Sequence, residues 1–350
     1  MVNPFRFGVW VEYWTMNNSD ISFNFVFDFD INPDFDNRYF KEIGPQLYNL
    51  FGITNVEFKV NSITKELTDY IQLILDGKHK VQVILKDNFN DLNIHKHFFI
   101  KNKIVPIIEL DEVSDNKKPL PTKLFSLIDI DFNVYISVLS TDNISEYLDE
   151  INNDSIKAFK IIHPKKFEYD KVDSYQILNE LDKIKNNNNL NFKTFVFPYL
   201  EEQEVHNYYK PNKSIRSFLS CFRAWFSLTI NENGQVSVCD NSFVGSIFEN
   251  SLAEIFNGQQ HNNLREEIIK KKQFDRCKNC HNFYLDNLLI VDNKKVEYKG
   301  KVFEFESELN YTKSAPSVGL YSEANNLVSV EPLFGKVPES RMQDLLFILK

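Results

Sequence analysis

Apolar and polar positions follow two different periods along the first two hundred residues of the chain. Short runs rich in β-branched and aromatic residues predict strands, and amphipathic segments of helical period lie between them. The predicted strands are Asn55–Val60, Lys80–Leu85, Ile104–Leu110, Phe132–Val138, Ile156–Ile162 and Asn191–Phe197, with an additional first strand at Phe7–Trp14. The clearest helical patterns are Ile63–Gly77 and Asp173–Asn186.

Regular alternation of strand and helix predicts parallel β/α units joined by right-handed crossovers. The number of strands falls short of a full eight-fold barrel. We therefore expect an α/β fold, a partial (β/α)6-type barrel spanning residues 1–205, with a doubly wound open sheet as the alternative. The stretch Glu201–Ser214 is polar and contains a proline, and we place the domain boundary there.

The pattern changes beyond this boundary and predicts a small α+β domain over residues 215–290. Two strand-like runs, Arg223–Ile230 and Gln235–Cys239, flank an Asn-Glu-Asn-Gly turn and predict a hairpin. Short helices are predicted at Ser251–Asn257 and Asn263–Lys272. Residues 291–350 form a C-terminal extension with further strand-like runs and a predicted terminal helix, Glu339–Lys350.

Charge and composition exclude several classes of protein. The 350 residues carry a formal net charge of -9, with no basic stripe of the kind that nucleic acids require, and Lys270–Lys272 is typical of a solvated helix face. No apolar run is long enough to cross a membrane, and the N-terminus lacks the pattern of a signal peptide. We therefore expect a cytoplasmic protein, in which cysteines bind metal more often than they form disulfides.

All four cysteines of the chain lie in one stretch, which predicts a metal site. They are Cys221, Cys239, Cys277 and Cys280, and the last two form a Cys-x2-Cys pair. Four thiolates suit either Zn²⁺ or an iron–sulfur cluster. Zinc ribbons usually present two Cys-x2-Cys pairs, whereas this chain has one, so the spacing favours a cluster and leaves zinc as the alternative.

The order of motifs around these cysteines is specific. Cys-x12-Gly-x4-Cys is followed by Gly245-Ser246-Ile247, Ser251–Phe256, Leu264-Arg265 and Cys-x2-Cys. This pattern, over Ser220 to Phe283, resembles the SPASM/twitch domain of radical S-adenosylmethionine enzymes. No cysteine follows Cys280, so the resemblance is to the shorter twitch form. It implies one [4Fe–4S] cluster held by all four cysteines, with no open iron site.

The same resemblance implies that the first half derives from a radical S-adenosylmethionine barrel, but its signature motifs are missing. The three positions of the family's Cys-x3-Cys-x2-Cys motif fall on Asn18, Ser22 and Phe25, after a Trp-x-Glu-x-Thr phrase at Trp10–Thr15. The Gly-Gly-Glu-Pro motif after the second strand is replaced by Phe58–Ile63. The chain is therefore expected not to cleave S-adenosylmethionine. The alternative is an unrelated α/β domain joined to a metal module.

Other polar residues near predicted strand ends are weaker candidates. His95 and His97 would share a face if they lay on a strand, although a surface helix or turn is the better prediction. The side chains of His163, Glu109, Asp111 and Asp87 would lie near the mouth of a β/α barrel. None is assigned a catalytic role, so the catalytic residues are unknown.

The resemblance implies a peptide-maturation component that binds a precursor peptide or a partner enzyme such as an ATP-grasp ligase. No nucleic-acid or membrane partner is expected. Two further hypotheses remain open. The protein is an enzyme with non-radical chemistry at the barrel mouth and a structural cluster, or it is a zinc-stapled interaction module. Metal content distinguishes a cluster from zinc.

Overall fold

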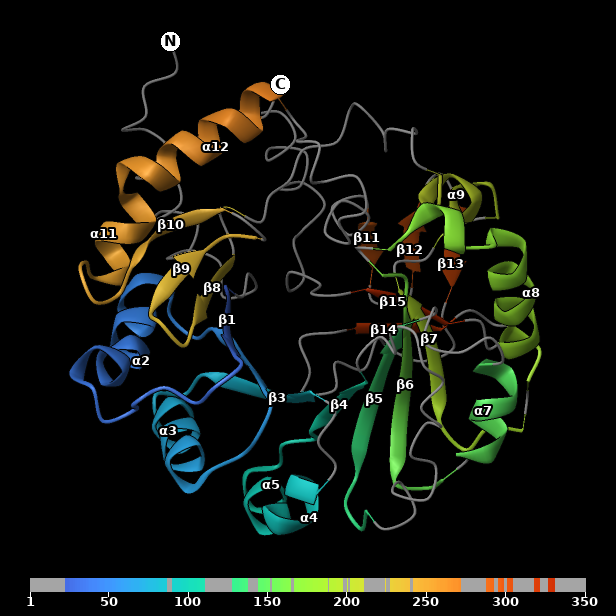
Figure 1. Ribbon diagram of the computed structural model, residues 1–350, viewed down its shortest axis with the longest axis horizontal. Helices are drawn as coiled ribbons and strands as arrows, with labels where there is room; N and C mark the ends of the chain where they lie inside the picture. Colours follow the sequence, from blue (N-terminus) through green and yellow to red (C-terminus); the bar gives the residue numbers. More distant parts are fainter. Residues whose placement is uncertain are drawn as a thin grey trace. The chain divides into compact units, whose positions relative to one another are not determined.

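The computed structural model describes most of the chain between residues 23 and 330. The described residues are 23–86, 90–110, 128–137, 144–151, 153–164, 167–187, 189–197, 200, 202–210, 224, 227–239, 242–271, 288–292, 295–298, 301–304, 318–321 and 327–330. The chain divides into two compact units. Unit 1 combines Met1–Ile84, Ser220–Gln273 and Leu333–Lys350, and unit 2 combines Leu85–Leu219 and Phe274–Pro332. Each unit is considered by itself (Figure 1).

Unit 1 contains a mixed sheet in which the N-terminal strands continue directly into the strands of the cysteine region. Its strands are β1 (Asn24–Phe29), β2 (Asn55–Val60), β3 (Lys80–Lys86), β8 (Ser227–Asn231), β9 (Gln235–Ser237) and β10 (Phe243–Ser246), in the order β10-β9-β8-β1-β2-β3. Its helices are α2 (Arg38–Phe51), α3 (Lys65–Asp76), α11 (Leu252–Asn257) and α12 (Gln259–Lys271). Strand β1 pairs in parallel with both β2 and β8, while β9 and β10 complete an antiparallel edge.

One face of this sheet is built from aromatic side chains. Phe25, Phe27 and Phe29 alternate along β1 and are fully buried. Phe27 stacks on Phe58 of β2 with ring centroids 4.7 Å apart, and it meets Tyr70 of α3 edge to face at 5.6 Å. Burying side chains of this size contributes roughly 2–3 kcal/mol each, so this face anchors α2 and α3 to the sheet.

The helix ends of unit 1 follow local sequence signals. Thr64 caps α3 by accepting a hydrogen bond from the Leu67 backbone N–H. Ser251 and Glu254 form a reciprocal capping box at the start of α11. Such caps stabilise a helix by about 1 kcal/mol, because the first backbone N–H groups have no partner within the helix.

The predicted hairpin is confirmed as β8 and β9. The backbone N–H of Gly234 donates to the Asn231 carbonyl at 2.9 Å, and the Asn231 side chain accepts from the N–H groups of Asn233 and Gln235. Gly234 has φ +70°, a conformation that other residues rarely adopt. The turn therefore needs an asparagine at its start and a glycine at its end.

Unit 2 contributes six consecutive strands, of which the first four are parallel. Its strands are β4 (Ile107–Leu110), β5 (Phe132–Ser137), β6 (Ile156–Ile162), β7 (Lys193–Phe197), β14 (Val318–Tyr321) and β15 (Leu327–Val330), in the order β4-β5-β6-β7-β15-β14. A separate antiparallel sheet consists of β11 (Leu288–Asp292), β12 (Lys295–Tyr298) and β13 (Lys301–Glu304). The helices are α4 (Asn90–Ile94), α5 (Lys96–Asn102), α7 (Ile144–Glu150), α8 (Ser174–Lys185) and α9 (Glu202–Tyr208), with a 3-10 turn at Tyr169–Lys171.

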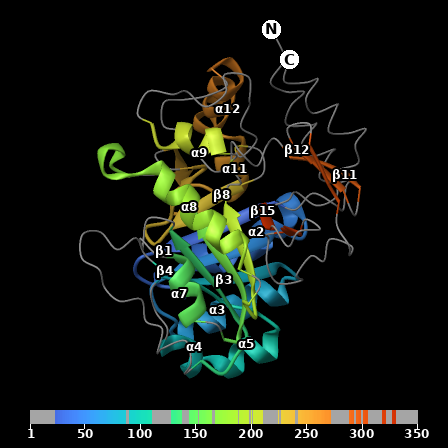
Figure 2. The ribbon, with the colours of Figure 1, turned by 90° about the vertical axis from the view of Figure 1, so that its right-hand side faces the viewer.

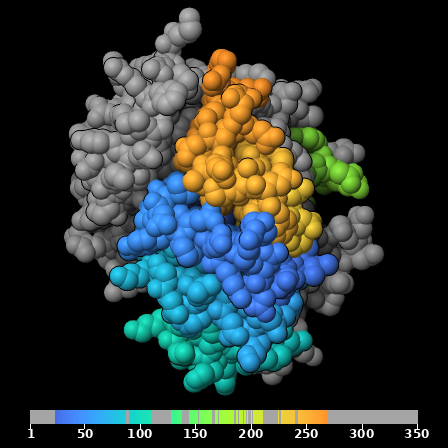
Figure 3. Space-filling model, turned by 90° about the vertical axis from the view of Figure 1, so that its left-hand side faces the viewer, coloured from blue at the N-terminus to red at the C-terminus, as the bar shows by residue number. Residues whose placement is uncertain are grey.

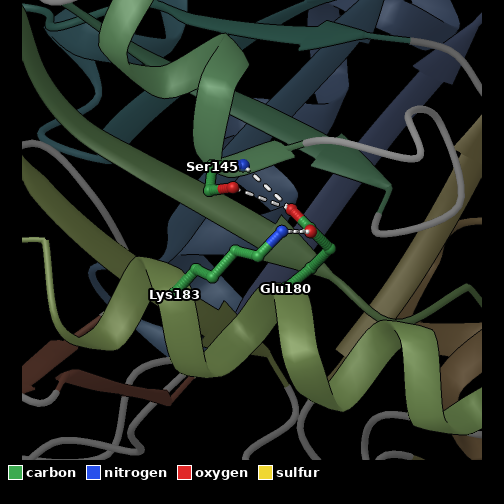
Figure 4. A network of polar contacts seen from close by, with 3 residues as sticks. All are labelled: Ser145, Glu180 and Lys183. Carbon is green, nitrogen blue, oxygen red and sulfur yellow. Dashed lines mark hydrogen bonds and ion pairs between the residues drawn. The ribbon is translucent and has the colours of Figure 1, made fainter.

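Helices α7 and α8 lie over the same face of the parallel strands (Figure 2) and are joined by a buried carboxylate. Glu180 of α8 accepts from the hydroxyl and the backbone N–H of Ser145 on α7, and from Lys183 (Figure 4). Burial alone would raise the pKa of Glu180, but the hydrogen bonds from Lys183 and Ser145 outweigh it and the pKa is lowered. The pair of helices is therefore tied by a fully bonded carboxylate.

The predicted α/β class with parallel β/α units is confirmed. All six strands predicted between residues 55 and 197 are present, and the two clearest helical patterns form α3 and α8. Helix α9 (Glu202–Tyr208) lies within the stretch Glu201–Ser214 and was not predicted. Strand β1 was not predicted. The strand at Phe7–Trp14 and the helix at Glu339–Lys350 lie outside the described residues, and the division into 1–205, 215–290 and 291–350 stays a prediction.

Substituting Gly234 tests how strongly the hairpin turn depends on glycine. A Cβ at position 234 would lie 2.7 Å from Phe248 and 2.9 Å from Ile247, whereas a Cβ at Gly52, where φ is +69°, would meet nothing within 4 Å. Both substitutions to alanine incur backbone strain of about 1 kcal/mol. We expect G234A to lower the free energy of unfolding by about 1–3 kcal/mol more than G52A, because only G234A adds a steric clash.

Urea unfolding of the two variants, followed by circular dichroism, measures this difference. Equal loss of stability in G234A and G52A would contradict the clash and leave only the shared backbone strain.

Candidate metal centre

Cys239 is the candidate ligand whose surroundings the structure describes. It follows β9 and lies in a tight turn, in which the Ser242 backbone N–H donates to the Cys239 carbonyl at 2.9 Å. Its thiol is half-buried, forms no disulfide, and lies 2.8 Å from the Ser242 hydroxyl. If the sulfur is a thiolate, the hydroxyl must be the donor in this contact. A thiolate that accepts a hydrogen bond from a buried serine fits the requirements of a metal ligand.

The other three candidate ligands, Cys221, Cys277 and Cys280, lie outside the described residues. Among the described residues, no three His, Cys, Asp or Glu side chains converge as a metal site would require. The described residues therefore include two segments at or near the candidate ligands. One is the turn at Cys239, and the other is the contact between α12 and Ala224, three residues after Cys221.

Helix α12 holds Ala224 through two side chains. The Ala224 carbonyl accepts a hydrogen bond from Nε2 of His261 at 2.8 Å and another from Nε of Arg265 at 3.2 Å. Both Ala224 and His261 are fully buried. Burial lowers the pKa of His261 to about 3, with a further contribution from the Arg265 charge, and burial lowers the pKa of Arg265 to about 9. At neutral pH the histidine is therefore neutral and the guanidinium is charged.

The cysteine region packs against the N-terminal strands. Figure 3 shows its described residues, in yellow and orange, directly against the blue residues of β1 and α2. Phe256 of α11 meets Phe51 of α2 edge to face, with ring centroids 4.8 Å apart. Gln46 of α2 accepts a hydrogen bond from the Leu252 backbone N–H at 2.7 Å. These contacts fix the frame of the candidate centre on the sheet of unit 1.

Comparison with known families supports the assignment of this region. Residues 221–281 match SPASM, an iron–sulfur cluster-binding domain. The chain carries a SPASM domain. All four cysteines lie within the matched residues. No curated protein matches the chain in sequence.

Comparison with solved structures shows a similar fold in SuiB of Streptococcus suis. SuiB bound to the precursor peptide SuiA has a TM-score of 0.50 and 15% identity, over 74% of this chain and 70% of that chain. SuiB by itself has a TM-score of 0.50 and 14% identity, over 81% and 77%. SuiB bound to S-adenosylmethionine has a TM-score of 0.49 and 15% identity, over 81% and 75%. At these identities the similarity concerns the fold alone.

The structure corrects the alignment of the missing cysteine motif. Phe25, expected in the loop after the first strand, lies inside β1 and is fully buried. The loop that links β1 to α2 is residues 30–37, which contains no cysteine, and no cysteine precedes Cys221 anywhere in the chain. Trp10–Thr15, Asn18 and Ser22 lie outside the described residues. The conclusion that this loop has no thiol is unchanged, although the register was wrong.

The loops after β1 and β2 are tied to each other by asparagine side chains. Asn61 donates to the Asp30 carbonyl at 3.0 Å, and Asn32 donates to the Ser62 carbonyl at 3.3 Å. Asn61 and Ser62 stand where the resemblance places the family's Gly-Gly-Glu-Pro motif. The place of this motif is therefore taken by hydrogen bonds from asparagine side chains to the backbone of the neighbouring loop.

The face of the unit 1 sheet opposite its aromatic face is polar. The register of β1 with β2 and β8 places the buried Val26 on this face among polar and charged side chains, which are Asn24, Asp28, Asn55, Glu57, Lys59, Ser227, Thr229 and Asn231. All but Ser227 are half-buried, and the Ser227 hydroxyl makes no hydrogen bond within the described part of the chain. Parallel strands are usually apolar on both faces, so a polar face marks a surface suited to a polar ligand.

This polar face was missed at the level of sequence, although a signal was present. The strand Asn55–Val60 alternates strictly between polar and apolar residues. A parallel strand with this alternation has one face that is not packed by apolar side chains. The pattern therefore contained the information, but the partner strands β1 and β8 were needed to show that the polar positions align.

In unit 2, one predicted candidate lies in a row of polar and aromatic residues. Glu109 of β4, Tyr135 of β5 and Lys160 of β6 occupy consecutive register positions on one face. The Lys160 side chain is almost fully buried, and its ammonium group lies 4.5 Å from the centre of the Tyr135 ring. Asp87 and Asp111 lie outside the described residues. Cation–π contact with a buried lysine places a positive charge on this face.

The histidine candidates do not converge. His163 is fully buried after β6, where its Nδ1 lies 2.7 Å from the Tyr209 hydroxyl, and burial lowers its pKa to about 3. His95 precedes α5 and His97 lies within it, so they do not share a strand face. The expectation of a surface helix or turn for His95 and His97 is confirmed. His163 is a neutral residue of the core in this environment.

His163 makes the stability of the protein depend on pH. Its pKa is about 3 when folded and about 6.5 when unfolded, so the unfolded state binds more protons between these values. Stability is full above pH 6.5 and falls as pH drops through this window, by about 1.4 kcal/mol per pH unit for one such histidine. We expect H163Q to have a shallower acid limb than the wild type by this amount.

The measurement is urea unfolding between pH 4 and pH 7.5. H97Q, which changes an exposed histidine on α5, serves as the control and should keep the wild-type slope. An H163Q slope equal to that of the wild type would show that His163 does not control the acid limb.

Proposed function

We propose that this chain binds one [4Fe–4S] cluster through Cys221, Cys239, Cys277 and Cys280, and that it serves in peptide maturation without cleaving S-adenosylmethionine. The observation that carries this proposal is the distribution of thiols. All four lie within the SPASM segment, and none lies elsewhere in the chain. A cluster with four protein ligands has no open iron, so its roles are electron transfer or structural support.

The absence of thiols before Cys221 carries the second part of the proposal. The loop from β1 to α2 has no cysteine, and Asn61 and Asn32 bond the two neighbouring loops to each other. This chain's own residues there supply hydrogen-bonding amides in place of cluster ligands. The modifying chemistry would then come from a partner enzyme, for which an ATP-grasp ligase is our proposal.

The polar face of the unit 1 sheet supports binding of a precursor peptide. It offers amide, hydroxyl and charged groups of both signs, and the Ser227 hydroxyl is buried without a hydrogen bond to any described residue. An extended peptide presents unpaired backbone donors and acceptors that such groups satisfy. SuiB, which has a similar fold, is bound to its precursor peptide SuiA in one structure.

Metal and sulfide content of protein purified without oxygen tests the cluster. We expect about four irons and four sulfides per chain, and C239S should lose most of both, because each iron of a fully ligated cluster needs one thiolate. One zinc without iron would contradict the cluster and leave a structural zinc site.

Incubation of the loaded protein with S-adenosylmethionine and dithionite tests the second part. We expect no 5′-deoxyadenosine above the level of a protein-free control, because the first loop holds no thiol. Turnover of S-adenosylmethionine by the purified chain would refute this part while leaving the auxiliary cluster in place.

Peptide binding is tested with a fluorescent peptide that is first selected from a random peptide library for binding to the wild-type chain. We expect the double variant N55A/T229A on the polar face to bind about tenfold more weakly, since each lost hydrogen bond costs roughly 0.5–1.5 kcal/mol. The control T68A/Q72A changes polar residues of α3 on the opposite side of the sheet. Equal affinity of both variants would place the peptide elsewhere.

A further inference from the structure

Helix α12 carries a buried positive charge that no described carboxylate balances. The Arg265 guanidinium donates from Nη1 to the Phe256 carbonyl at 2.9 Å and to Oδ1 of Asn262 at 3.1 Å. It also stacks over the Phe256 ring, 4.2 Å from the ring centre. Its Nη2 is buried and has no hydrogen-bond partner within the described part of the chain. All these contacts are with neutral groups, so the charge itself is uncompensated there.

The guanidinium lies close to the candidate metal ligands. Its Nε donates to the carbonyl of Ala224 at 3.2 Å, and Ala224 is three residues from Cys221. Three peptide units span at most about 11 Å between Cα atoms, and with the lengths of the side chains added the guanidinium lies within roughly 20 Å of the Cys221 sulfur. His261 donates to the same carbonyl and is neutral, so the pair contributes a single positive charge.

An unbalanced buried cation is costly, and proteins usually pair such a charge with an anion or a metal group of opposite charge. A [4Fe–4S] cluster held by four thiolates has a net negative charge, which grows by one when the cluster is reduced. A nearby cation therefore stabilises the reduced cluster more than the oxidised one. The net charge around a cluster is one of the factors that set its reduction potential.

We propose that Arg265 is the built-in counter-charge of the cluster and raises its reduction potential, which rests on the cluster assigned under the proposed function. Arg265 is a positioning and tuning residue, because it acts through Ala224 and through its field and does not contact iron. Its forked hydrogen bonds hold the segment that follows Cys221, while its charge favours the reduced state. Substitutions can separate the effect of the Arg265 charge from the effect of its hydrogen bonds.

The test is a redox titration of the full chain, purified without oxygen and followed by electron paramagnetic resonance. At the wild-type midpoint potential, R265Q should lower the ratio of reduced to oxidised cluster at least about fourfold, as expected for one charge within roughly 20 Å at an effective dielectric constant near 20. R265K keeps the charge and should stay close to the wild-type ratio. K270Q removes an exposed charge from the same helix and should leave the ratio unchanged, because water and salt screen it.

A second substitution keeps the test decisive if R265Q does not fold or load iron. N262D puts a carboxylate where Nη1 of Arg265 already donates, so it neutralises the guanidinium without removing it. It should lower the ratio as R265Q does, whereas N263D on the exposed side of α12 should not.

The outcomes separate the two proposals. Four irons per chain with an unchanged ratio in R265Q, or in N262D when R265Q cannot be loaded, would overturn the counter-charge and leave the cluster standing. Zinc in place of iron would overturn both. A ratio lowered equally by R265K and R265Q would assign the effect to the lost hydrogen bonds and overturn the role of the charge.

Discussion

Parallel pairing of β1 with both β2 and β8 is the constraint on which the rest of unit 1 depends. It joins strands that are about two hundred residues apart in the chain, so it incurs a large loop-closure cost. The buried aromatic residues of β1 offset this cost, because they pack against α2, α3 and the strands on both sides. Once β8 pairs with β1, the hairpin places β9, and Cys239 just after it, on the side of β8 that faces away from β1.

The same pairing determines both faces of the sheet. Side chains alternate along each strand, so a register that aligns the phenylalanines on one face must align the polar residues on the other. Helices cover the aromatic face, and the other face carries amides, hydroxyls and charges beside the buried Val26. The packing that holds the metal region in place and the surface proposed for the peptide are therefore two consequences of one register.

Electrostatics links α12 to the candidate centre. Arg265 and His261 bind one carbonyl close to Cys221, and burial keeps the histidine neutral while the guanidinium remains charged. The Ser242 hydroxyl lies against the sulfur of Cys239 on the other side. A hydroxyl donor at Cys239 and a cation bonded to the carbonyl of Ala224 both favour negative charge on the neighbouring thiols, as a cluster with four thiolates requires. In unit 2, the buried carboxylate of Glu180 is instead satisfied locally by Ser145 and Lys183.

Local patterns were sufficient to predict much of this protein. The strands from β2 to β7, helices α3 and α8, and the hairpin at Asn231–Gly234 follow from periodicity and turn residues, because these depend on neighbours in the sequence. The spacing of the four cysteines indicated the SPASM domain for the same reason. Sequence analysis missed β1, although its alternating phenylalanines lie between turn-forming residues at 17–20 and 32–34. It also missed α9, because this helix lies in a polar stretch that contains few apolar residues. Long-range pairing decided the polar face and the contact of Arg265 with Ala224, because both depend on residues that only the folded chain brings together.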